Sequence, residues 1–320
     1  MSRVNPSPTP SLTLQLFRLP RAAALLIPWL THLLVADILL SALLPLAAFL
    51  PTTAYNLSSQ IAASVWRSIQ SIFTRSNHAQ IIVSGADALP RSGESAIVVS
   101  NHVDWVDFYM INELGWRTGM LGRCRYFAKR QLKWVPFLGW GLWAMGMPLV
   151  SRDWTSDRRE MDRIFHGVLE RKWPMWLISY SEGTRYTATK RLETEAWVRQ
   201  HPPRRLGANL LYPRTKGFVA SVQKLRSAPQ VRAVYDLTIA YARNHDGAFQ
   251  QAPTFLQTVM NPCIGEDYRF YVHVDRHAME DLPQEDGDLA TWLEERWVQK
   301  GERLEGLRQS LNQGKLWVTK

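Results

Sequence analysis

A long apolar stretch near the N-terminus constrains the fold of this chain more than any other feature of the sequence. From 22 to 50, 23 of 29 residues are Ala, Val, Leu, Ile, Phe or Trp, and no Lys or Arg lies among them. As a helix rising about 1.5 Å per residue, the stretch reaches about 43 Å, longer than the roughly 30 Å hydrocarbon core of a bilayer. It is interrupted by Pro28, His32, Asp37 and Pro45. A single span and a kinked or re-entrant hairpin therefore both stay open.

The two flanks of this stretch bear on its orientation. Arg18 and Arg21 precede it, and a strongly basic region follows it. Because Lys and Arg are retained on the cytosolic side, two basic flanks favour a hairpin over a single span and place the rest of the chain in the cytosol. A cleaved signal peptide is disfavoured, because the run is longer than a typical signal core and no small-residue cleavage site follows it.

Four segments follow from composition and periodicity. Residues 1–20 begin with a Pro- and Ser-rich sequence that predicts disorder, and residues 21–79 are expected to form membrane-embedded and interfacial helices. Within the second segment, residues 52–79 form an amphipathic helix that can lie on the membrane or against the rest of the protein. Its apolar stripe comprises Ile61, Val65, Trp66, Ile69 and Phe73.

Residues 80–280 alternate short β-rich runs with helical runs, which predicts an α/β domain with a largely parallel sheet flanked by helices. The expected strands are 81–83, 96–100, 126–128, 147–150, 175–179, 234–241 and 270–274. Residues 281–320 are expected to be a helical appendage, because 286–313 form a charged, capped helix typical of a solvated element. The predicted fold is therefore α/β, with an N-terminal membrane-embedded helical segment.

The positive charge of the chain is concentrated in its centre. The formal net charge is +10, and residues 185–232 carry 11 Lys or Arg against 2 Asp or Glu. Such a region predicts an anionic partner, for which phospholipid, a phosphorylated small molecule and nucleic acid are the candidates. Seven tryptophans lie between Trp116 and Trp176. They favour a membrane surface, where indole rings lie at headgroup level, although ordinary core packing explains them as well.

A polar turn with catalytic potential follows the second expected strand. After residues 96–100 the chain reads Asn-His-Val-Asp-Trp-Val-Asp, and α/β folds place reactive groups at the carboxyl ends of strands. Asp104 fits a helix N-cap, which puts Asp107 in the first helical turn, where its carboxylate can accept from the ring of His102. A neutral His102 held in this way can take a proton from a hydroxyl group. The spacing also fits a helix cap beside a surface histidine.

A second polar loop follows the expected strand at 175–179. Residues 180–185 read Tyr-Ser-Glu-Gly-Thr-Arg, which places a carboxylate, a flexible glycine, a hydroxyl and a guanidinium close together. Arg185 can grip two phosphate oxygens, and Thr184 can add a donor. Glu182 can hold the arginine or accept from a substrate hydroxyl. Alone, this run also fits a simple turn.

Together the two motifs resemble the glycerolipid acyltransferase family, which includes the 1-acylglycerol-3-phosphate acyltransferases. The pattern Asn-His-x-x-x-x-Asp stands at 101–107 and Glu-Gly-Thr-Arg at 182–185, with a middle block at 128–154 between them. The resemblance covers roughly residues 80 to 245. A Val-Pro-Val type block found in many members is absent at 234–238, and residues 210–218 resemble instead the eukaryotic branch.

The resemblance implies a role for each motif residue. His102 is expected to be the catalytic base and Asp107 its orienting partner. Contacts with the phosphate or glycerol of the acceptor are implied for Glu182, Gly183, Thr184 and Arg185. Further candidates for the anionic groups of the acceptor or of acyl-CoA are Lys129, Arg152, Arg214 and Lys216.

The implied reaction moves an acyl group from acyl-CoA to the free glycerol hydroxyl of a lysophospholipid. Lysophosphatidate is the first expected acceptor, and lysophosphatidylinositol or another lysophospholipid is the alternative. Acyl-CoA is a co-substrate, membrane lipid is a partner, and no cofactor or metal is expected. The implied location is the endoplasmic reticulum membrane with the catalytic domain facing the cytosol, or a lipid droplet. Activity is expected to fall below pH about 6.5, the ordinary histidine pKa.

Other classes of protein explain the sequence less well. No Gly-x-Ser-x-Gly motif, Walker loop or Gly-rich kinase loop occurs, which disfavours serine hydrolases, NTPases and kinases. A metal site formed by His102 with Asp104 and Asp107 is conceivable, but the further ligand it needs is not evident. Two cysteines exclude a four-cysteine zinc site. Nucleic-acid binding has no module signature, and the apolar stretch argues against it. A non-catalytic membrane-surface adaptor explains everything except the two motifs.

Overall fold

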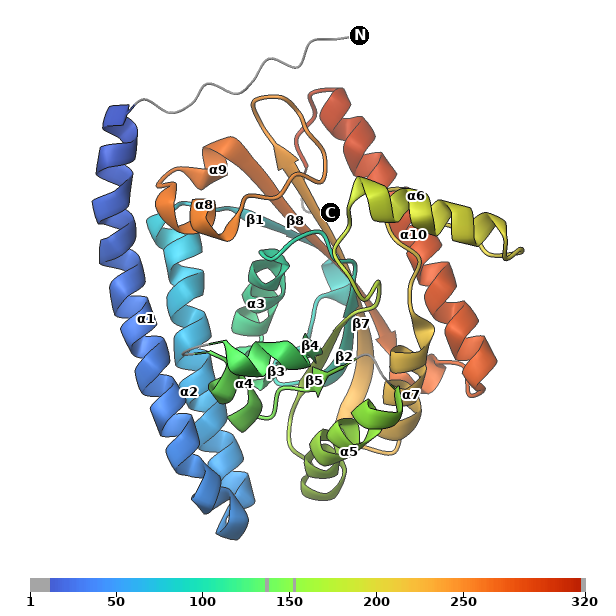
Figure 1. Ribbon diagram of the computed structural model, residues 1–320. Helices are drawn as coiled ribbons and strands as arrows, with labels where there is room; N and C mark the ends of the chain where they lie inside the picture. The colour runs from blue at the N-terminus through green and yellow to red at the C-terminus, as the bar shows by residue number, and fades with distance from the viewer. Residues whose placement is uncertain (1–11, 136–137, 152–153, 318–320) are drawn as a thin grey trace.

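A six-stranded sheet forms the centre of the molecule. The structure, a computed structural model, describes residues 12–135, 138–151 and 154–317. The strand order is β1-β8-β7-β2-β6-β3, and helices cover both faces of the sheet (Figure 1). All neighbouring strands are parallel except the pair β7 and β8. The strands are β1 Ile81–Ser84, β2 Ser95–Ser100, β3 Cys124–Tyr126, β6 Trp176–Tyr180, β7 Val231–Arg243 and β8 Tyr268–Ala278.

This architecture confirms the predicted α/β class with a largely parallel sheet. Each of the seven expected runs overlaps a strand. The expected run 126–128 is divided between β3 and β4 (Ala128–Lys129), and β4 pairs with β5 (Leu149–Val150) in a separate two-stranded sheet. The remaining short elements are η2 Ala86–Ala88, η3 Leu121–Arg123, η4 Arg130–Trp134, α4 Gly139–Ala144, α6 Ala188–Arg199, α8 Phe255–Met260, α9 Ile264–Asp267 and η5 Met279–Asp281.

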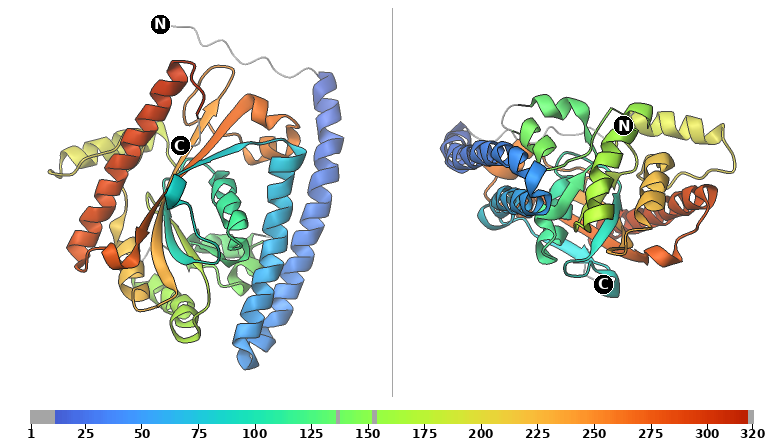
Figure 2. Two further views of the ribbon diagram at one scale, coloured as in Figure 1. Left: turned by 180° about the vertical axis from the view of Figure 1, so that it is seen from behind. Right: turned by 90° about the horizontal axis from the view of Figure 1, so that it is seen from below.

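The central strand β2 shows why the sheet needs helices on both sides. All six of its residues are buried, and its side chains alternate between two hydrophobic cores. Ala96 and Val98 belong to the core under α2 (Pro51–Ser71) and α3 (Asp107–Arg117), whereas Ile97 and Val99 belong to the other core. That second core includes side chains of α5 (Trp154–Arg171), α7 (Thr215–Leu225) and α10 (Asp286–Asn312). Figure 2 shows α10 on the side of the sheet opposite the two N-terminal helices. A strand buried on two faces reads as a nearly continuous apolar run, which in β2 is the stretch from Ala96 to Val99 between two buried serines.

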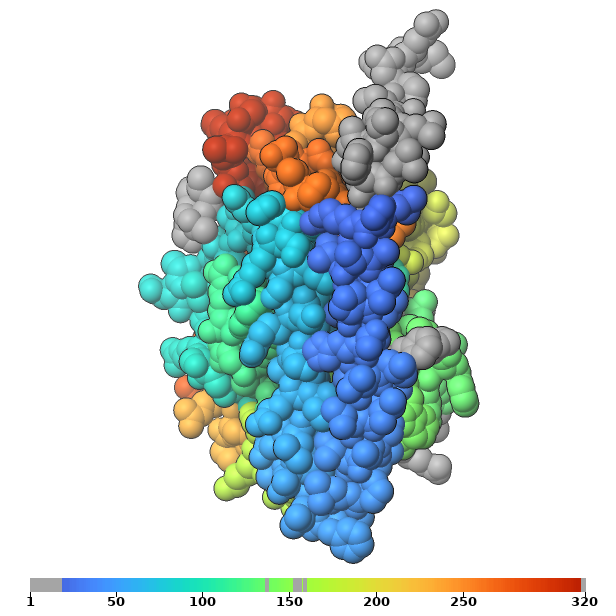
Figure 3. Space-filling model, turned by 90° about the vertical axis from the view of Figure 1, so that its left-hand side faces the viewer, coloured from blue at the N-terminus to red at the C-terminus, as the bar shows by residue number. Residues whose placement is uncertain are grey.

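The apolar N-terminal stretch forms one helix, α1, from Leu12 to Phe49. The helix continues through Pro28 and Pro45, and its segment Leu19–Phe49 is long and apolar enough to cross a membrane. Helix α2 begins at Pro51 and runs back beside α1, so that the two helices lie together on one side of the molecule (Figure 3). The most apolar window of α1 is only 11% buried. The segment is therefore a candidate span whose outer face lacks a protein partner among the described residues.

Helix α2 resolves an alternative that the sequence leaves open. Its stripe faces the domain: Val65 and Ile69 are buried, and Phe73, in the π-helical turn η1 (Ile72–Ser76), stacks on Tyr109 of α3 at 4.1 Å. The amphipathic helix thus packs against the α/β domain. The start of α1 is held there as well, because the guanidinium of Arg21 donates to the carbonyl oxygen of Ser76 at 2.7 Å.

Helix α10 corrects the expectation of a solvated appendage. Its side chains Leu289, Leu293, Trp297 and Leu304 are buried in the core beneath the sheet. Lys300 is completely buried, and its Nζ lies 2.6 Å from Oδ1 of Asp236 on β7. The helix carries many charged residues, but its apolar residues recur at helical spacing and form one buried face. The charged residue Lys300 belongs to that face.

Candidate active site

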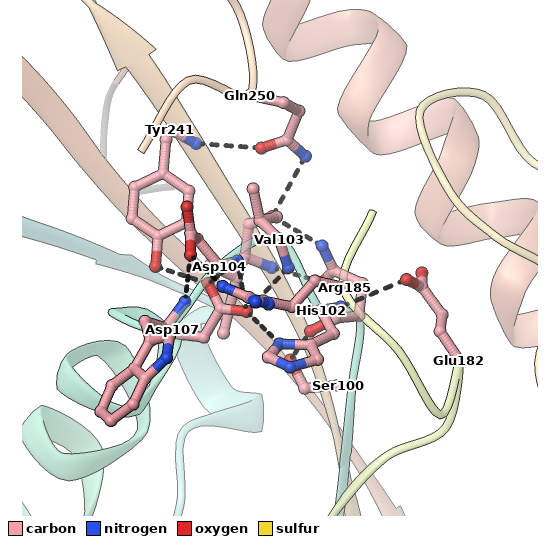
Figure 4. Close-up of polar contacts among 12 residues, drawn as sticks. Ser100, His102, Val103, Asp104, Asp107, Glu182, Arg185, Tyr241 and Gln250 are labelled. Atoms are coloured by element: carbon pink, nitrogen blue, oxygen red, sulfur yellow. Dashed lines mark hydrogen bonds and ion pairs between the residues drawn. The ribbon is translucent and has the colours of Figure 1, made fainter. Parts of the chain in front are cut away.

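The two polar motifs lie side by side because of the order of the strands. Strands β2 and β6 are parallel neighbours, and Ser100 at the end of one pairs with Tyr180 at the end of the other. The loops that follow them therefore leave the same edge of the sheet. A backbone hydrogen bond of 2.8 Å from Tyr186 N to the carbonyl oxygen of His102 joins the loops directly. Figure 4 shows the resulting cluster, in which side chains from both loops converge.

His102 and Asp107 form the expected pair. The ring Nδ1 of His102 lies 2.8 Å from Oδ2 of Asp107, and the histidine side chain is 20% exposed whereas the aspartate is fully buried. Three further groups donate to this carboxylate: the backbone N–H groups of Val103 and Asp104, and the hydroxyl of Tyr241 at 2.8 Å. Because this carboxylate accepts from the ring, it places the proton of a neutral His102 on Nδ1. The ring nitrogen Nε2 is then the acceptor, as a general base requires.

Asp104 is not the helix cap that the sequence predicts. Helix α3 begins at Asp107 with Val106 at the N-cap position, and no side chain caps it there. The carboxylate of Asp107 turns back and accepts from the N–H groups of Val103 and Asp104, which precede the helix, so it does not cap α3 either. Asp104 instead forms an ion pair with the second motif, since its Oδ1 lies 3.1 Å from a guanidinium nitrogen of Arg185.

Three residues that the sequence analysis did not single out support His102. The ring of Tyr180 stacks on the imidazole with 4.1 Å between centroids. The side-chain amide of Asn101 exchanges two hydrogen bonds with the backbone of Ile239 on β7, at 2.9 and 2.8 Å. Tyr241, also on β7, holds Asp107. Asn101 is the first residue of one motif and Tyr180 opens the run that contains the other, so the sequence offered a signal for both. Nothing local in the sequence points to Tyr241.

Glu182 links the motif loops to the C-terminal helix. It is 2% exposed, and its two carboxyl oxygens accept from His102 N and from the indole Nε1 of Trp297, each at 3.4 Å. Burial raises the pKa of Glu182 to about 8, and those donors lower it less. Of the two roles that the sequence leaves open for Glu182, the structure does not have it hold Arg185, because that arginine pairs with Asp104.

The rest of the second motif forms a tight cationic turn. Gly183 has φ +68°, a left-handed conformation that favours glycine, and a Cβ there would lie 2.9 Å from Cδ of Arg214. The hydroxyl of Thr184 accepts from Nζ of Lys190 at the start of α6. Half of the Arg185 side chain is exposed. The loop thus brings three cationic side chains together at the edge that carries His102.

The other candidate residues differ in their placement. Arg214 packs beside Gly183, and Lys216 is exposed in the first turn of α7. Lys129 is exposed on the small sheet of β4 and β5. Arg152 lies outside the described residues. In the part of the chain that the structure describes, no group of three or more His, Cys, Asp or Glu side chains is arranged to hold a metal ion.

This arrangement can perform one kind of chemistry well. A buried carboxylate orients an imidazole whose free nitrogen can accept a proton, and a half-exposed guanidinium on the adjacent loop can bind an anion. A molecule that carries both a hydroxyl and a phosphate group matches this pair of functions.

Comparison with known proteins gives consistent family matches. The sequence profile described as Acyltransferase matches residues 80–242, and the profile described as Acyltransferase C-terminus matches residues 264–312. A 1-acyl-sn-glycerol-3-phosphate acyltransferase 3 of Arabidopsis thaliana is 32% identical over 221 residues, covering 66% of this chain and 53% of that protein. The 1-acyl-sn-glycerol-3-phosphate acyltransferase delta of Homo sapiens is 34% identical over 207 residues, covering 65% and 51%.

Two further similarities are more distant. Lysocardiolipin acyltransferase 1 of Gallus gallus is 26% identical over 226 residues, covering 71% of this chain and 57% of that protein. The crystal structure of a 1-acyl-sn-glycerophosphate acyltransferase from Thermotoga maritima aligns with a TM-score of 0.45 at 15% identity, covering 85% of this chain and 97% of that one. The chain spans about half the length of the curated relatives it matches.

Proposed function

Since the chain belongs to the Acyltransferase family, whose profile matches half of it, we propose that it transfers a fatty acyl group from acyl-CoA to the free glycerol hydroxyl of a lysophospholipid. The preferred acceptor is lysophosphatidate, and the product is phosphatidate. The observation that carries this proposal is the juxtaposition of the His102–Asp107 pair with the guanidinium of Arg185 at one edge of the sheet.

The proposed reaction is a direct transfer with His102 as the base. Nε2 of His102 takes the proton of the acceptor hydroxyl, and the oxygen attacks the thioester carbonyl carbon. A carbon–oxygen bond forms, the carbon–sulfur bond breaks, and coenzyme A leaves as a thiol after receiving the proton from the imidazolium. Asp107 stabilises that imidazolium through Nδ1. The reaction requires no covalent enzyme intermediate.

The acceptor is chosen on electrostatic grounds. Arg185, Lys190 and Arg214 surround the turn at Gly183 and Thr184, and a phosphate monoester carries about two negative charges. Lysophosphatidate presents such a monoester next to its free hydroxyl. Lysophosphatidylinositol and other lysophospholipids present a phosphodiester with a single charge, and they are the alternative acceptors.

We further propose that the protein works at a membrane, through α1. The apolar segment Leu19–Phe49 supports this, as does its exposed outer face. The endoplasmic reticulum, with the α/β domain in the cytosol, is the proposed location, and a lipid droplet is the alternative. The basic region that follows the segment favours the cytosolic orientation of the α/β domain.

The proposal is tested by the release of coenzyme A from oleoyl-CoA by the detergent-solubilised protein. The acceptors are lysophosphatidate, lysophosphatidylinositol, lysophosphatidylglycerol and lysophosphatidylcholine, each alone. We expect the fastest release with lysophosphatidate and a loss of about 10²- to 10⁴-fold in kcat for His102→Ala. His166→Ala, at an exposed position of α5, is the matched control. If none of the four acceptors supports release of coenzyme A, or if the His102→Ala variant is unaffected, a non-catalytic adaptor is favoured.

A further inference from the structure

We propose that the carboxylate of Asp104 is an intramolecular competitor of the acceptor phosphate: it occupies the anion-binding end of Arg185 and leaves when phosphate arrives. The inference rests on the proposed function, because it concerns the acceptor half of that reaction. It assigns to Asp104 a role in setting acceptor affinity, in addition to the roles of His102 and Asp107 in proton transfer.

The contacts of Asp104 are those expected of a bound anion. Its Oδ1 lies 3.1 Å from the guanidinium nitrogen Nη1 of Arg185 and 2.6 Å from the backbone nitrogen of Trp105. A guanidinium together with a backbone N–H is also a common donor set for a phosphate oxygen. The carboxylate thus stands where one oxygen of a phosphate on Arg185 would stand.

This position is fixed relative to the base. The backbone nitrogen of Asp104 donates to both oxygens of Asp107, at 3.3 and 3.2 Å, so Asp104 is part of the turn that orients His102. Figure 4 shows Arg185 reaching this turn from the second motif loop, with His102 alongside. A phosphate that replaced the carboxylate on Arg185 would therefore lie next to the imidazole that activates the hydroxyl.

Among the acidic residues of the two motifs, Asp104 is the one suited to exchange. Asp107 is fully buried, and Glu182 is 2% exposed and held by Trp297. The Asp104 and Arg185 side chains are 37% and 50% exposed. Exposed ion pairs of this kind stabilise weakly, with an effect on an equilibrium below about fivefold, so an incoming dianion can displace the carboxylate.

The neighbouring charges favour that displacement. The ammonium group of Lys190 donates to the hydroxyl of Thr184, and the side chain of Arg214 packs against Gly183. A phosphate bound at Arg185 therefore approaches two additional cations. A phosphate monoester also matches the guanidinium fork bidentately. The Asp104 carboxylate competes with every phosphate ligand that binds Arg185. It therefore lowers the affinity for substrate and for product by the same factor.

The variant Asp104→Asn tests this directly, because the asparagine oxygen can still accept from Trp105 N while the charge is lost. The first readout is a thermal-shift titration of the full-length protein with inorganic phosphate, which needs no turnover. We expect the dissociation constant to fall about two- to fivefold. Glu193→Gln, which removes one exposed charge from α6, is the matched control and should not change it.

The kinetic readout uses lysophosphatidate as substrate and phosphatidate as product inhibitor. In Asp104→Asn, the KM and the product inhibition constant should fall by the same factor as the phosphate dissociation constant, with kcat not increased. In an Arg185→Ala background, Asp104→Asn should have no effect on any of them.

Two results would overturn the inference: unchanged or weaker phosphate binding in folded Asp104→Asn, or an equal gain when Arg185 is absent. Absence of acyl transfer by the wild-type protein would instead contradict the proposed function, and the phosphate titration would still decide the role of Asp104.

Discussion

At the scale of single residues, the carboxylate of Asp107 joins the parts of the site, because it binds the His102 ring, the turn before α3 and the hydroxyl of Tyr241. It receives hydrogen bonds from four groups, of which only the His102 ring is a partner that spacing along the chain suggests. The helix cap predicted at Asp104 is absent, and the Asp107 carboxylate accepts instead from N–H groups that precede the helix. A buried carboxylate must satisfy all its lone pairs, so the surrounding turn wraps around it.

The hydroxyl of Tyr241 should contribute to catalysis through Asp107, as a positioning group. We expect Tyr241→Phe to lower kcat by about tenfold or less, with KM for the acceptor unchanged, because one of four donors to the carboxylate is lost. Steady-state kinetics with lysophosphatidate measure this. Tyr271→Phe, which removes a hydroxyl bonded to Ser84 on the other side of the sheet, is the control. A larger loss than in His102→Ala would contradict a positioning role.

Glu182 should make stability depend on pH. Its pKa is raised from 4.5 to about 8 in the folded protein. Between these values the unfolded chain releases a proton that the folded protein retains, so the free energy of unfolding falls as pH rises. The fall is on the order of 4 kcal/mol between pH 4.5 and 8, and it levels off above pH 8.

Glu182→Gln removes this titration. Urea unfolding at pH 5, 6, 7 and 8 should show a difference between variant and wild type that shifts in favour of the variant as pH rises. A constant difference across the pH range would show that Glu182 is ionised in the folded protein.

At the scale of elements, helix α10 is the clearest difference between expectation and structure. The pattern of residues 286–313 predicts a helix, and its residues form one, yet the charged residues suggested solvation. Its docking depends on partners far away along the chain: Asp236 on β7 and Glu182 after β6. No local signal in the helix reports that Lys300 has a buried partner.

The ion pair of Lys300 and Asp236 should be essential for docking α10. Lys300→Ala leaves a buried carboxylate without its cation, and we expect a loss of about 3 to 5 kcal/mol in the free energy of unfolding. The double variant Lys300→Met with Asp236→Asn removes both charges and should recover much of that loss. Urea denaturation measures both. Equal losses in the single and double variants would assign the effect to packing alone.

At the scale of the whole molecule, helices α1 and α2 form one side and the α/β domain the other (Figures 1 and 3). Helix α2 is committed to the domain by its buried stripe. Helix α1 is held at its start by Arg21 and by the contact of Trp29 with Phe255 of α8, while its outer face stays apolar and exposed. That exposed face is what a bilayer can cover.

Charges on this outer face should weaken membrane binding. Ile27, Leu34 and Ile38 are exposed on α1, and their replacement by Arg should abolish sedimentation of the protein with phospholipid vesicles. The physical reason is the loss of about 1.5 to 3 kcal/mol of apolar burial per side chain, together with the penalty for charge in hydrocarbon. Arg at Leu192 on α6 and at Leu316, beyond the end of α10, is the control and should leave binding intact. Equal effects of both sets would contradict a role specific to α1.

The sequence alone determined the α/β class, the position of nearly every strand, the apolar N-terminal helix and the residue types of the two motifs. Each of these can be predicted from the local periodicity of apolar residues or from the order of the sequence motifs, because strand and helix patterns depend on neighbouring residues. The closeness of His102 and Asp107 also followed from spacing, since they are five residues apart in one turn.

Only the tertiary structure decided which groups complete the site. The donor Tyr241 reaches Asp107 from β7, 134 residues away, because β7 lies next to β2 in the sheet. The burial of Glu182 under α10, the stripe of α2 turned toward the domain and the pair of Asp104 with Arg185 arise in the same way. Strand order and helix docking decide such contacts, and they depend on burying two faces of one sheet at once, which no single segment of the sequence encodes.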